Sequence, residues 1–320
     1  MGFRRKTVAV AAAWLTILGL SACDPPPRAQ ITVDSTAVGA DGNPGDGVCS
    51  APTADGGCTL QAAVEEAAAL GPADIHVPAG AYDGQGTTLT VAGSVAISGD
   101  GVQATRLEDF RFVVAVTGSL RLIDVSDTLA DAVAVAFAVE GRLVLSRTSV
   151  TGAVEAISVA EGGSVGLWSS VVTSFMPLVN EGEAVAYGST MRLIHGRWGA
   201  VFGAGDAEWA ATATLAWAAS PGFGVSCDPT GLTSHGYNRS SWNCGLTAVG
   251  DSDGLVESEF QGPDGTYPVP VATSPLVDAI PVGQAGCALD TLDLLGNPRG
   301  VDGNGDGIPG CDIGAVELQP

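Results

Sequence analysis

The chain has 320 residues, of which 46% are hydrophobic, only 15% are charged and 45 are glycines. This composition is too apolar for a disordered polymer and too rich in glycine for a helical bundle. Acidic residues outnumber basic residues by 35 to 13, which gives a formal net charge of −22. A surface of that sign repels polyanions, so the composition excludes nucleic acid as a partner.

The N-terminus predicts export and a lipid anchor. Residues 1–22 have the order of a secretory signal, in which three basic residues precede an uncharged stretch too short to span a bilayer. The Leu-Ser-Ala-Cys segment that ends at Cys23 resembles the lipobox of bacterial lipoproteins. This resemblance implies acylation of Cys23 and a place in the bacterial cell envelope, on the surface or periplasmic face of a membrane. The alternative is an ordinary signal peptide whose cleavage site adjoins a cysteine.

A tether and a cap module follow the signal. Residues 23–30 contain three consecutive prolines, which make a short and stiff tether. Residues 31–73 contain one convincing helix, over 59–70, which begins with Thr59 as N-cap and ends at Gly71-Pro72. A solenoid must cover its open ends, because exposed strand edges pair with other chains. We therefore expect this helix to close the N-terminal end of a repeat.

An internal repeat predicts the fold. The motif Gly-x-φ-x-φ, with φ apolar, occurs six times between residues 93 and 209 with a mean glycine spacing of about 22. Three short alternating strands in each unit are what one coil of a parallel β-helix requires. Leucine-rich repeats would need a helix or an asparagine in each unit, and an immunoglobulin-like sandwich would not keep one glycine phase. We predict an all-β parallel β-helix over residues 74–217, with Leu120, Leu143 and Val165 in one inward file.

The cysteines predict disulfides. Six remain after Cys23, and they fall into three pairs that are near in sequence, with a long cysteine-free stretch between the first pair and the second. Nearest-neighbour pairing is the simplest connectivity, and it suits an oxidising compartment. The predicted bonds are Cys49–Cys58, Cys227–Cys244 and Cys287–Cys311. The last two pairs lie in residues 218–320, which we expect to form a disulfide-linked C-terminal extension.

Two segments resemble modules of known surface proteins. Residues 41–63, with the run Cys-Thr-Leu-Gln-Ala-Ala, resemble the N-terminal module named after the motif C-S-L-R-E-A, although three of its six letters differ. Residues 274–317 resemble the C-terminal segment of choice-of-anchor Q proteins. The resemblance implies a right-handed parallel β-helix of the pectin-lyase-like class on the cell envelope. It implies no catalytic residues.

One loop is a candidate calcium site. Asp302, Asn304, Asp306 and Gly307 match the first half of a calcium loop, and Asp312 follows one place before the expected twelfth ligand. The alternative is an Asp/Asn/Gly turn cluster whose side chains bond to their own backbone. No other cofactor is indicated.

Two aromatic residues are a candidate glycan platform. Trp168 and Tyr187 both occupy the fifth position after a repeat glycine, an outward phase on consecutive coils. Stacked exposed aromatic rings can bind sugar rings, and the net charge predicts that the glycan is neutral. The alternative is that the C-terminal segment folds back and buries both rings.

The function expected from the sequence is that of a non-catalytic cell-envelope lipoprotein, used in adhesion, glycan contact or envelope architecture. The alternative is a polysaccharide lyase or glycoside hydrolase of the pectin-lyase-like class, which rests on fold analogy alone. Within the repeats, only Asp124, Asp127 and Asp131 cluster as acidic candidates for such an enzyme, and Asp124 shares its repeat position with Arg147. This shared position favours a stacked ion pair over an acid or a base.

Overall fold

The computed structural model describes residues 27–129, 135–193, 201–203, 208–212, 214–218, 232–241, 247–255, 259–261, 267–284, 286–288 and 290–320. Within these ranges, no helix has the length and apolar character needed to cross a membrane. The expected signal over 1–22 and the lipidated Cys23 lie outside the described residues, as do Cys227 and Cys244.

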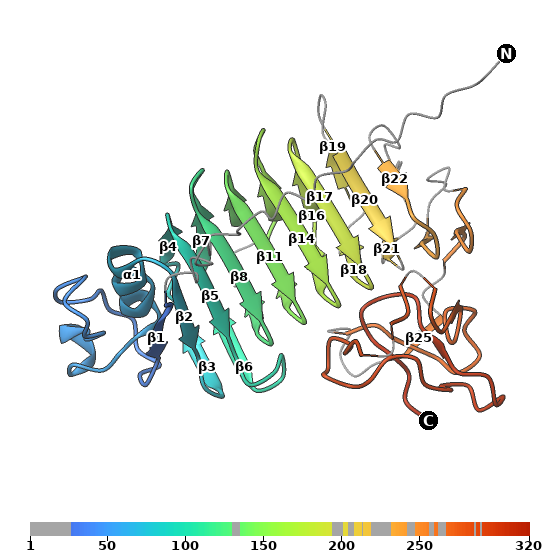
Figure 1. Ribbon diagram of the computed structural model, residues 1–320, viewed down its shortest axis with the longest axis horizontal. Helices are drawn as coiled ribbons and strands as arrows, with labels where there is room; N and C mark the ends of the chain where they lie inside the picture. The colour runs from blue at the N-terminus through green and yellow to red at the C-terminus, as the bar shows by residue number, and fades with distance from the viewer. Residues whose placement is uncertain are drawn as a thin grey trace, which may run out of the picture.

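The fold is a parallel β-helix built from three sheets, as predicted (Figure 1). Sheet A has the order β1 (Ala29–Thr32), β2 (Ala73–His76), β5 (Ser94–Ser98), β8 (Ser119–Ile123), β11 (Arg142–Ser146), β14 (Ser164–Trp168), β17 (Glu183–Tyr187), β20 (Glu208–Thr212) and β22 (Leu232–Ser234). Sheet B has the order β3 (Gly80–Asp83), β6 (Thr105–Glu108), β9 (Ser126–Thr128), β12 (Ser149–Thr151), β15 (Val171–Ser174), β18 (Thr190–Leu193), β21 (Leu215–Ala218), β23 (Arg239–Ser240) and β24 (Ser252–Asp253). Sheet C has the order β4 (Thr88–Val91), β7 (Arg111–Val114), β10 (Val135–Val139), β13 (Glu155–Val159), β16 (Met176–Asn180) and β19 (Val201–Gly203).

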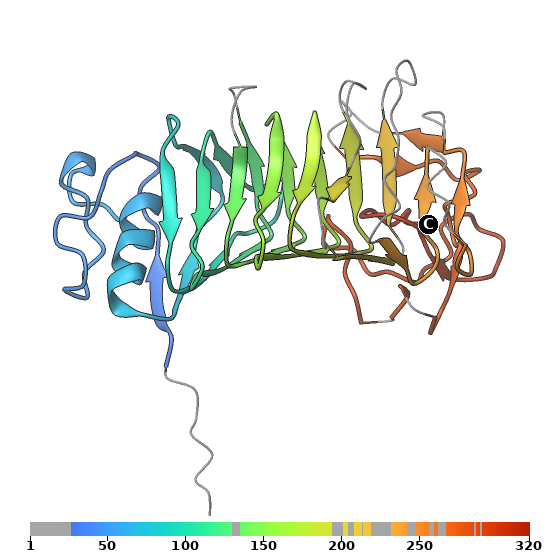
Figure 2. The ribbon, with the colours of Figure 1, turned by 90° about the horizontal axis from the view of Figure 1, so that it is seen from above.

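The interior of the β-helix is filled by stacked apolar files. Leu120, Leu143 and Val165 are direct partners on β8, β11 and β14, and all three are buried. This confirms the predicted inward file. On sheet C, Phe112 and Phe137 are also partners, and their rings stack with centroids 5.2 Å apart. Because alternate side chains of each strand enter the cylinder, one hydrophobic core runs along the coils. Figure 2 shows these coils side by side.

The repeat glycines serve close packing between coils rather than an unusual backbone angle. A Cβ at Gly141 would overlap the carbonyl oxygens of Ala115 and Gly118, which belong to the preceding coil. The left-handed backbone positions come six residues after these glycines, at Asp124 (φ 58°), Arg147 (φ 47°) and Ser169 (φ 46°), and only the coil of Gly188 (φ 52°) has a glycine there among the left-handed residues described. The glycines therefore mark the corner at which neighbouring backbones approach most closely.

The N-terminal end of the β-helix is covered as expected. Helix α1 (Leu60–Leu70) packs against β1, β2 and β4, and a short 3₁₀ helix, η1 (Pro52–Ala54), precedes it. Thr59 is the N-cap, since its hydroxyl oxygen accepts a hydrogen bond of 3.0 Å from the N–H of Ala62. The Cys49–Cys58 disulfide closes the loop that leads into the helix. The predicted capping helix and its neighbouring disulfide are both confirmed.

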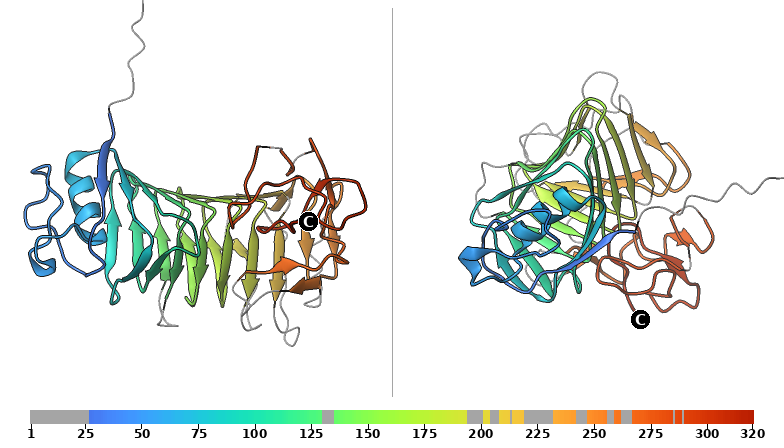
Figure 3. Two further views of the ribbon diagram at one scale, coloured as in Figure 1. Left: turned by 90° about the horizontal axis from the view of Figure 1, so that it is seen from below. Right: turned by 60° about the vertical axis from the view of Figure 1, so that its left-hand side comes forward.

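The C-terminal extension packs on the outer face of sheet B, beside the later coils (Figure 3). Val171 of β15 is buried against Leu294 and Val316 of the extension. The extension carries two small antiparallel ladders, β25 (Phe260–Gln261) with β26 (Val269–Pro270) and β27 (Ile280–Pro281) with β28 (Gly310–Cys311). The predicted Cys287–Cys311 disulfide ties the second ladder to the rest of the extension. Strand pairing in sheets A and B continues past residue 217, through β22, β23 and β24.

Candidate functional site: a groove on the outer face of sheet A

A groove of about 870 Å³ lies between the outer face of sheet A and the C-terminal extension. Its floor is formed by outward side chains of β2, β5, β8, β11, β14 and β17, and Asp290, Thr291 and Leu292 of the extension form part of its wall. The hydroxyl of Ser169 donates a hydrogen bond of 2.8 Å to the carbonyl oxygen of Leu292. The wall is therefore attached to the corner of the β-helix.

The candidate aromatic platform lies in this groove. Trp168 on β14 and Tyr187 on β17 are direct strand partners, and both side chains are partly buried. The indole ring of Trp168 lies over Gly166 two residues earlier, where any Cβ would overlap the ring. The hydroxyl of Tyr187 accepts a hydrogen bond of 2.9 Å from the N–H of Gly286. The extension thus holds the edge of Tyr187 and leaves both rings in the lining of the groove.

Sequence reasoning missed the basic lining of the groove. Five arginines line it, whereas the whole chain has only 13 basic residues. Three of the five arginines are paired with acidic side chains. Arg28 lies 2.5 Å from Asp74, and Arg147 lies 2.6 Å from Asp124. The third, Arg299, belongs to the extension, is buried, and lies 4.0 Å from Glu317. The remaining two, Arg121 and Arg142, are exposed. The repeat could have indicated both residues, because odd positions after a repeat glycine point outward. Arg121 is the third residue after Gly118, and Arg142 is the first residue after Gly141.

Asp124 and Asp127, the acidic candidates within the described residues, are not arranged as a catalytic pair, and Asp131 lies outside those residues. Arg147 binds both carboxylate oxygens of Asp124, at 2.6 Å each, so the predicted stacked ion pair is confirmed. Asp127 faces the interior, between Leu107 and Val150 on neighbouring strands, and is wholly buried. Burial, and secondly the charge of Asp109, raise the pKa of Asp127 well above its ordinary value. Asp127 is therefore closed off from any ligand in the groove.

The candidate calcium loop is held by hydrogen bonds to its own backbone. Asp302 accepts from the N–H groups of Gly305, Asp306 and Gly307 at 2.8 to 3.1 Å. Asn304 accepts from the N–H of Asp306 at 2.9 Å. Within the described ranges, no three His, Cys, Asp or Glu side chains converge on a common point that could hold a metal. The calcium site at Asp302, Asn304, Asp306 and Asp312 stays a prediction.

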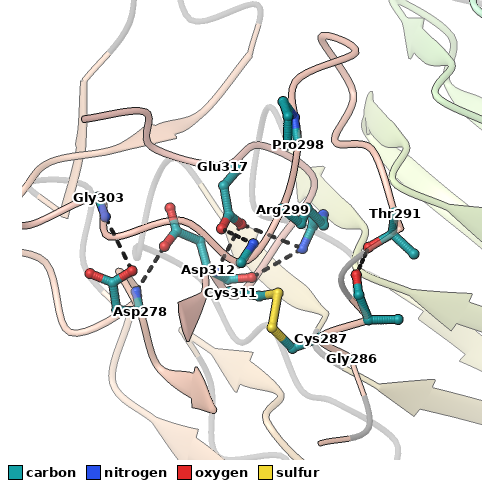
Figure 4. Close-up of a disulfide and its surroundings, with 12 residues drawn as sticks. Asp278, Gly286, Cys287, Thr291, Pro298, Arg299, Gly303, Cys311, Asp312 and Glu317 are labelled. Atoms are coloured by element: carbon teal, nitrogen blue, oxygen red, sulfur yellow. Dashed lines mark hydrogen bonds and ion pairs between the residues drawn. A yellow bond between two sulfur atoms is a disulfide. The ribbon is translucent and has the colours of Figure 1, made fainter. Parts of the chain in front are cut away.

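Asp312 belongs instead to a buried polar network inside the extension (Figure 4). Its carboxylate accepts hydrogen bonds from the N–H groups of Asp278 at 2.8 Å and Leu318 at 2.7 Å. Glu317 accepts from the N–H groups of Gly300 and Asp312, and Arg299 lies 4.0 Å from its carboxylate. Burial, followed by the nearby Glu317 carboxyl, raises the pKa of Asp312 to about 7. Burial also raises the pKa of Glu317, although Arg299 opposes the shift.

This network predicts a pH dependence of stability. The folded pKa of Asp312 is about 7, while the pKa of an unfolded Asp is about 4, so the folded state binds more protons between these two values. The free energy of unfolding should therefore fall as pH rises from about 4 to 7. Hydrogen exchange at the amides of Asp278 and Leu318, corrected for intrinsic rates, should show protection that declines over this window. Asp312→Asn should weaken the dependence, and protection that increases with pH would contradict the assignment.

Comparisons with models of protein families, with curated proteins and with solved structures found no match to this chain.

Proposed function

We propose that the protein is a non-catalytic cell-envelope lipoprotein whose β-helix contacts glycans through the groove on sheet A. The observation that carries the proposal is the adjacent placement of Trp168 and Tyr187 in a solvent-accessible groove. Aromatic faces bind sugar rings by stacking, and the sheet holds both side chains at fixed positions on neighbouring strands. In line with the sequence resemblance, we also propose that residues 41–63 and 274–317 are modules of envelope surface proteins.

The strength of such a site follows from its size. Stacking on an aromatic ring contributes on the order of 1 kcal/mol beyond the burial of area. A single groove should therefore bind weakly, and many copies on one membrane would raise the effective affinity by multivalency. A lipid anchor at Cys23 would supply this display, because it concentrates the protein on a surface.

Substitution of the aromatic pair tests the glycan contact. We expect Trp168→Ala and Tyr187→Ala each to reduce binding on a glycan array about fivefold, because each removes one stacking face. The melting temperature should change little, since neither side chain belongs to the apolar core and Tyr187 contributes one hydrogen bond, from the N–H of Gly286, to the docking of the extension. Val116→Ala, at an exposed position outside the groove, is the control. Unfolding by either aromatic substitution, or polysaccharide turnover by the wild type, would contradict the proposal.

Substitution of Cys23 tests the anchor. In a bacterial host, we expect the mature protein to begin at an acylated Cys23 and to fractionate with membranes. Cys23→Ser should release it into the aqueous fraction, because the acyl chains contribute about 0.8 kcal/mol for each buried CH₂. Mass spectrometry of the mature N-terminus is the measurement. A mature N-terminus at any other residue would refute the lipoprotein assignment.

A further inference from the structure

Two arginines of the groove have unused binding capacity. Arg121 and Arg142 are exposed, and within the described part of the chain the guanidinium group of neither makes a hydrogen bond or an ion pair. The other groove arginines each have an acidic partner. A guanidinium presents five N–H donors in a planar fork, which matches a carboxylate or a sulfate. Arg121 and Arg142 are therefore available to an anionic ligand.

The register of sheet A places these arginines beside the aromatic platform. Arg142 on β11 pairs with Ser119 on β8, and Arg121 on β8 pairs with Val144 on β11. The next strand, β14, carries Trp168. Neighbouring strands are about 4.8 Å apart, so both arginines lie within two strands of the indole ring. All three side chains project from the same face into one groove.

The local charge of the groove differs in sign from that of the whole chain. Three of the five lining arginines are paired with Asp74, Asp124 and Glu317, which leaves Arg121 and Arg142 against one further acidic residue of the lining, Asp290, although the chain has a net charge of −22. Fields are screened over about 8 Å at physiological ionic strength. A ligand inside the groove therefore experiences Arg121 and Arg142 more strongly than the acids on distant faces. The net charge predicts a neutral glycan, whereas the lining favours an acidic one.

We propose that the groove selects acidic glycans, a refinement that rests on the proposed glycan contact. In this arrangement a sugar ring stacks on Trp168, and carboxylate or sulfate groups of the same chain pair with Arg142 and Arg121. The aromatic face supplies affinity for sugar rings of any charge, and the arginines supply preference for the charged members.

The experiment uses the mature full-length protein on an array of matched neutral, carboxylated and sulfated forms of the same oligosaccharides. We expect about tenfold stronger binding to the acidic forms at low salt, and a preference that declines as salt is raised. The double variant Arg121→Gln, Arg142→Gln should lose this preference while retaining binding to the neutral forms. Arg106→Gln, which changes an exposed arginine paired with Glu108 outside the groove, is the matched control.

The outcomes separate this inference from the proposed function. Equal binding to neutral and acidic forms, sensitive to Trp168→Ala, would overturn the acidic preference and leave the glycan contact intact. An acidic preference that survives the double arginine substitution would also overturn the inference. No binding to any form would overturn the proposed glycan contact itself. Single-stranded oligonucleotide that binds with the same arginine dependence would replace the glycan assignment with a general polyanion site. A preference that differs between carboxylated and sulfated forms would identify the anionic group.

Discussion

Replacement of Gly141 by alanine should cost about 3 kcal/mol or more of the free energy of unfolding. The new Cβ would overlap the carbonyl oxygens of Ala115 and Gly118. Both are backbone atoms of the preceding coil, and Gly118 also accepts a hydrogen bond of 3.0 Å from the N–H of Arg142. The clash cannot be relieved by a rotamer change, because two coils would have to move apart and break their pairing. Denaturant unfolding followed by circular dichroism measures the loss.

Gly93 provides the matched control. It occupies the same repeat position as Gly141, but it lies on the first copy of the motif, where an added Cβ meets no atom within 4 Å. Gly93→Ala should therefore change stability by less than about 0.5 kcal/mol. Equal effects of the two substitutions would contradict the assignment of Gly141 to close packing between coils.

The repeat alone was enough to predict the fold because a β-helix reuses one pattern. Alternation fixes which side of each strand enters the cylinder, and a constant glycine phase stacks equivalent positions, so Leu120, Leu143 and Val165 could be aligned without a structure. The reason for the glycines could not be read in the same way. Both a left-handed corner and a close approach of two backbones favour glycine, and only the folded structure distinguishes the two reasons.

The groove could be predicted only in part. The outward phase of Trp168 and Tyr187 follows from the repeat, and so does that of Arg121 and Arg142. The wall of the groove does not follow from it, because Asp290, Thr291 and Leu292 come from an extension without periodicity. Its position depends on contacts more than 100 residues apart in sequence, such as that between Ser169 and Leu292. Net charge was also a poor guide, since it averages over faces with different local charge.

The docking of the extension should depend on one buried side chain, Arg299. Its guanidinium donates hydrogen bonds to the carbonyl oxygens of Gly188, Asp312 and Gly314, and it lies 4.0 Å from the buried carboxylate of Glu317. Only Gly188 of these partners belongs to the β-helix, so Arg299 joins the extension to the coil that carries Tyr187. Removal of one member of a buried ion pair typically costs about 3–5 kcal/mol, because the other charge is left without its partner.

We therefore expect Arg299→Ala to release the extension while the apolar files of the β-helix stay folded, since those files contain no residue of the extension. Hydrogen exchange should show the loss first at the amide of Ala315, which donates to the hydroxyl of Thr190 on β18. Arg106→Ala, which breaks an exposed pair with Glu108, should have little effect. The double variant Arg299→Met, Glu317→Gln removes both members of this ion pair and should be more stable than Arg299→Met alone. If the amide of Ala315 is as well protected from exchange in Arg299→Ala as in Arg106→Ala, then apolar contact through Leu294 and Val316, rather than the buried arginine, holds the extension in place.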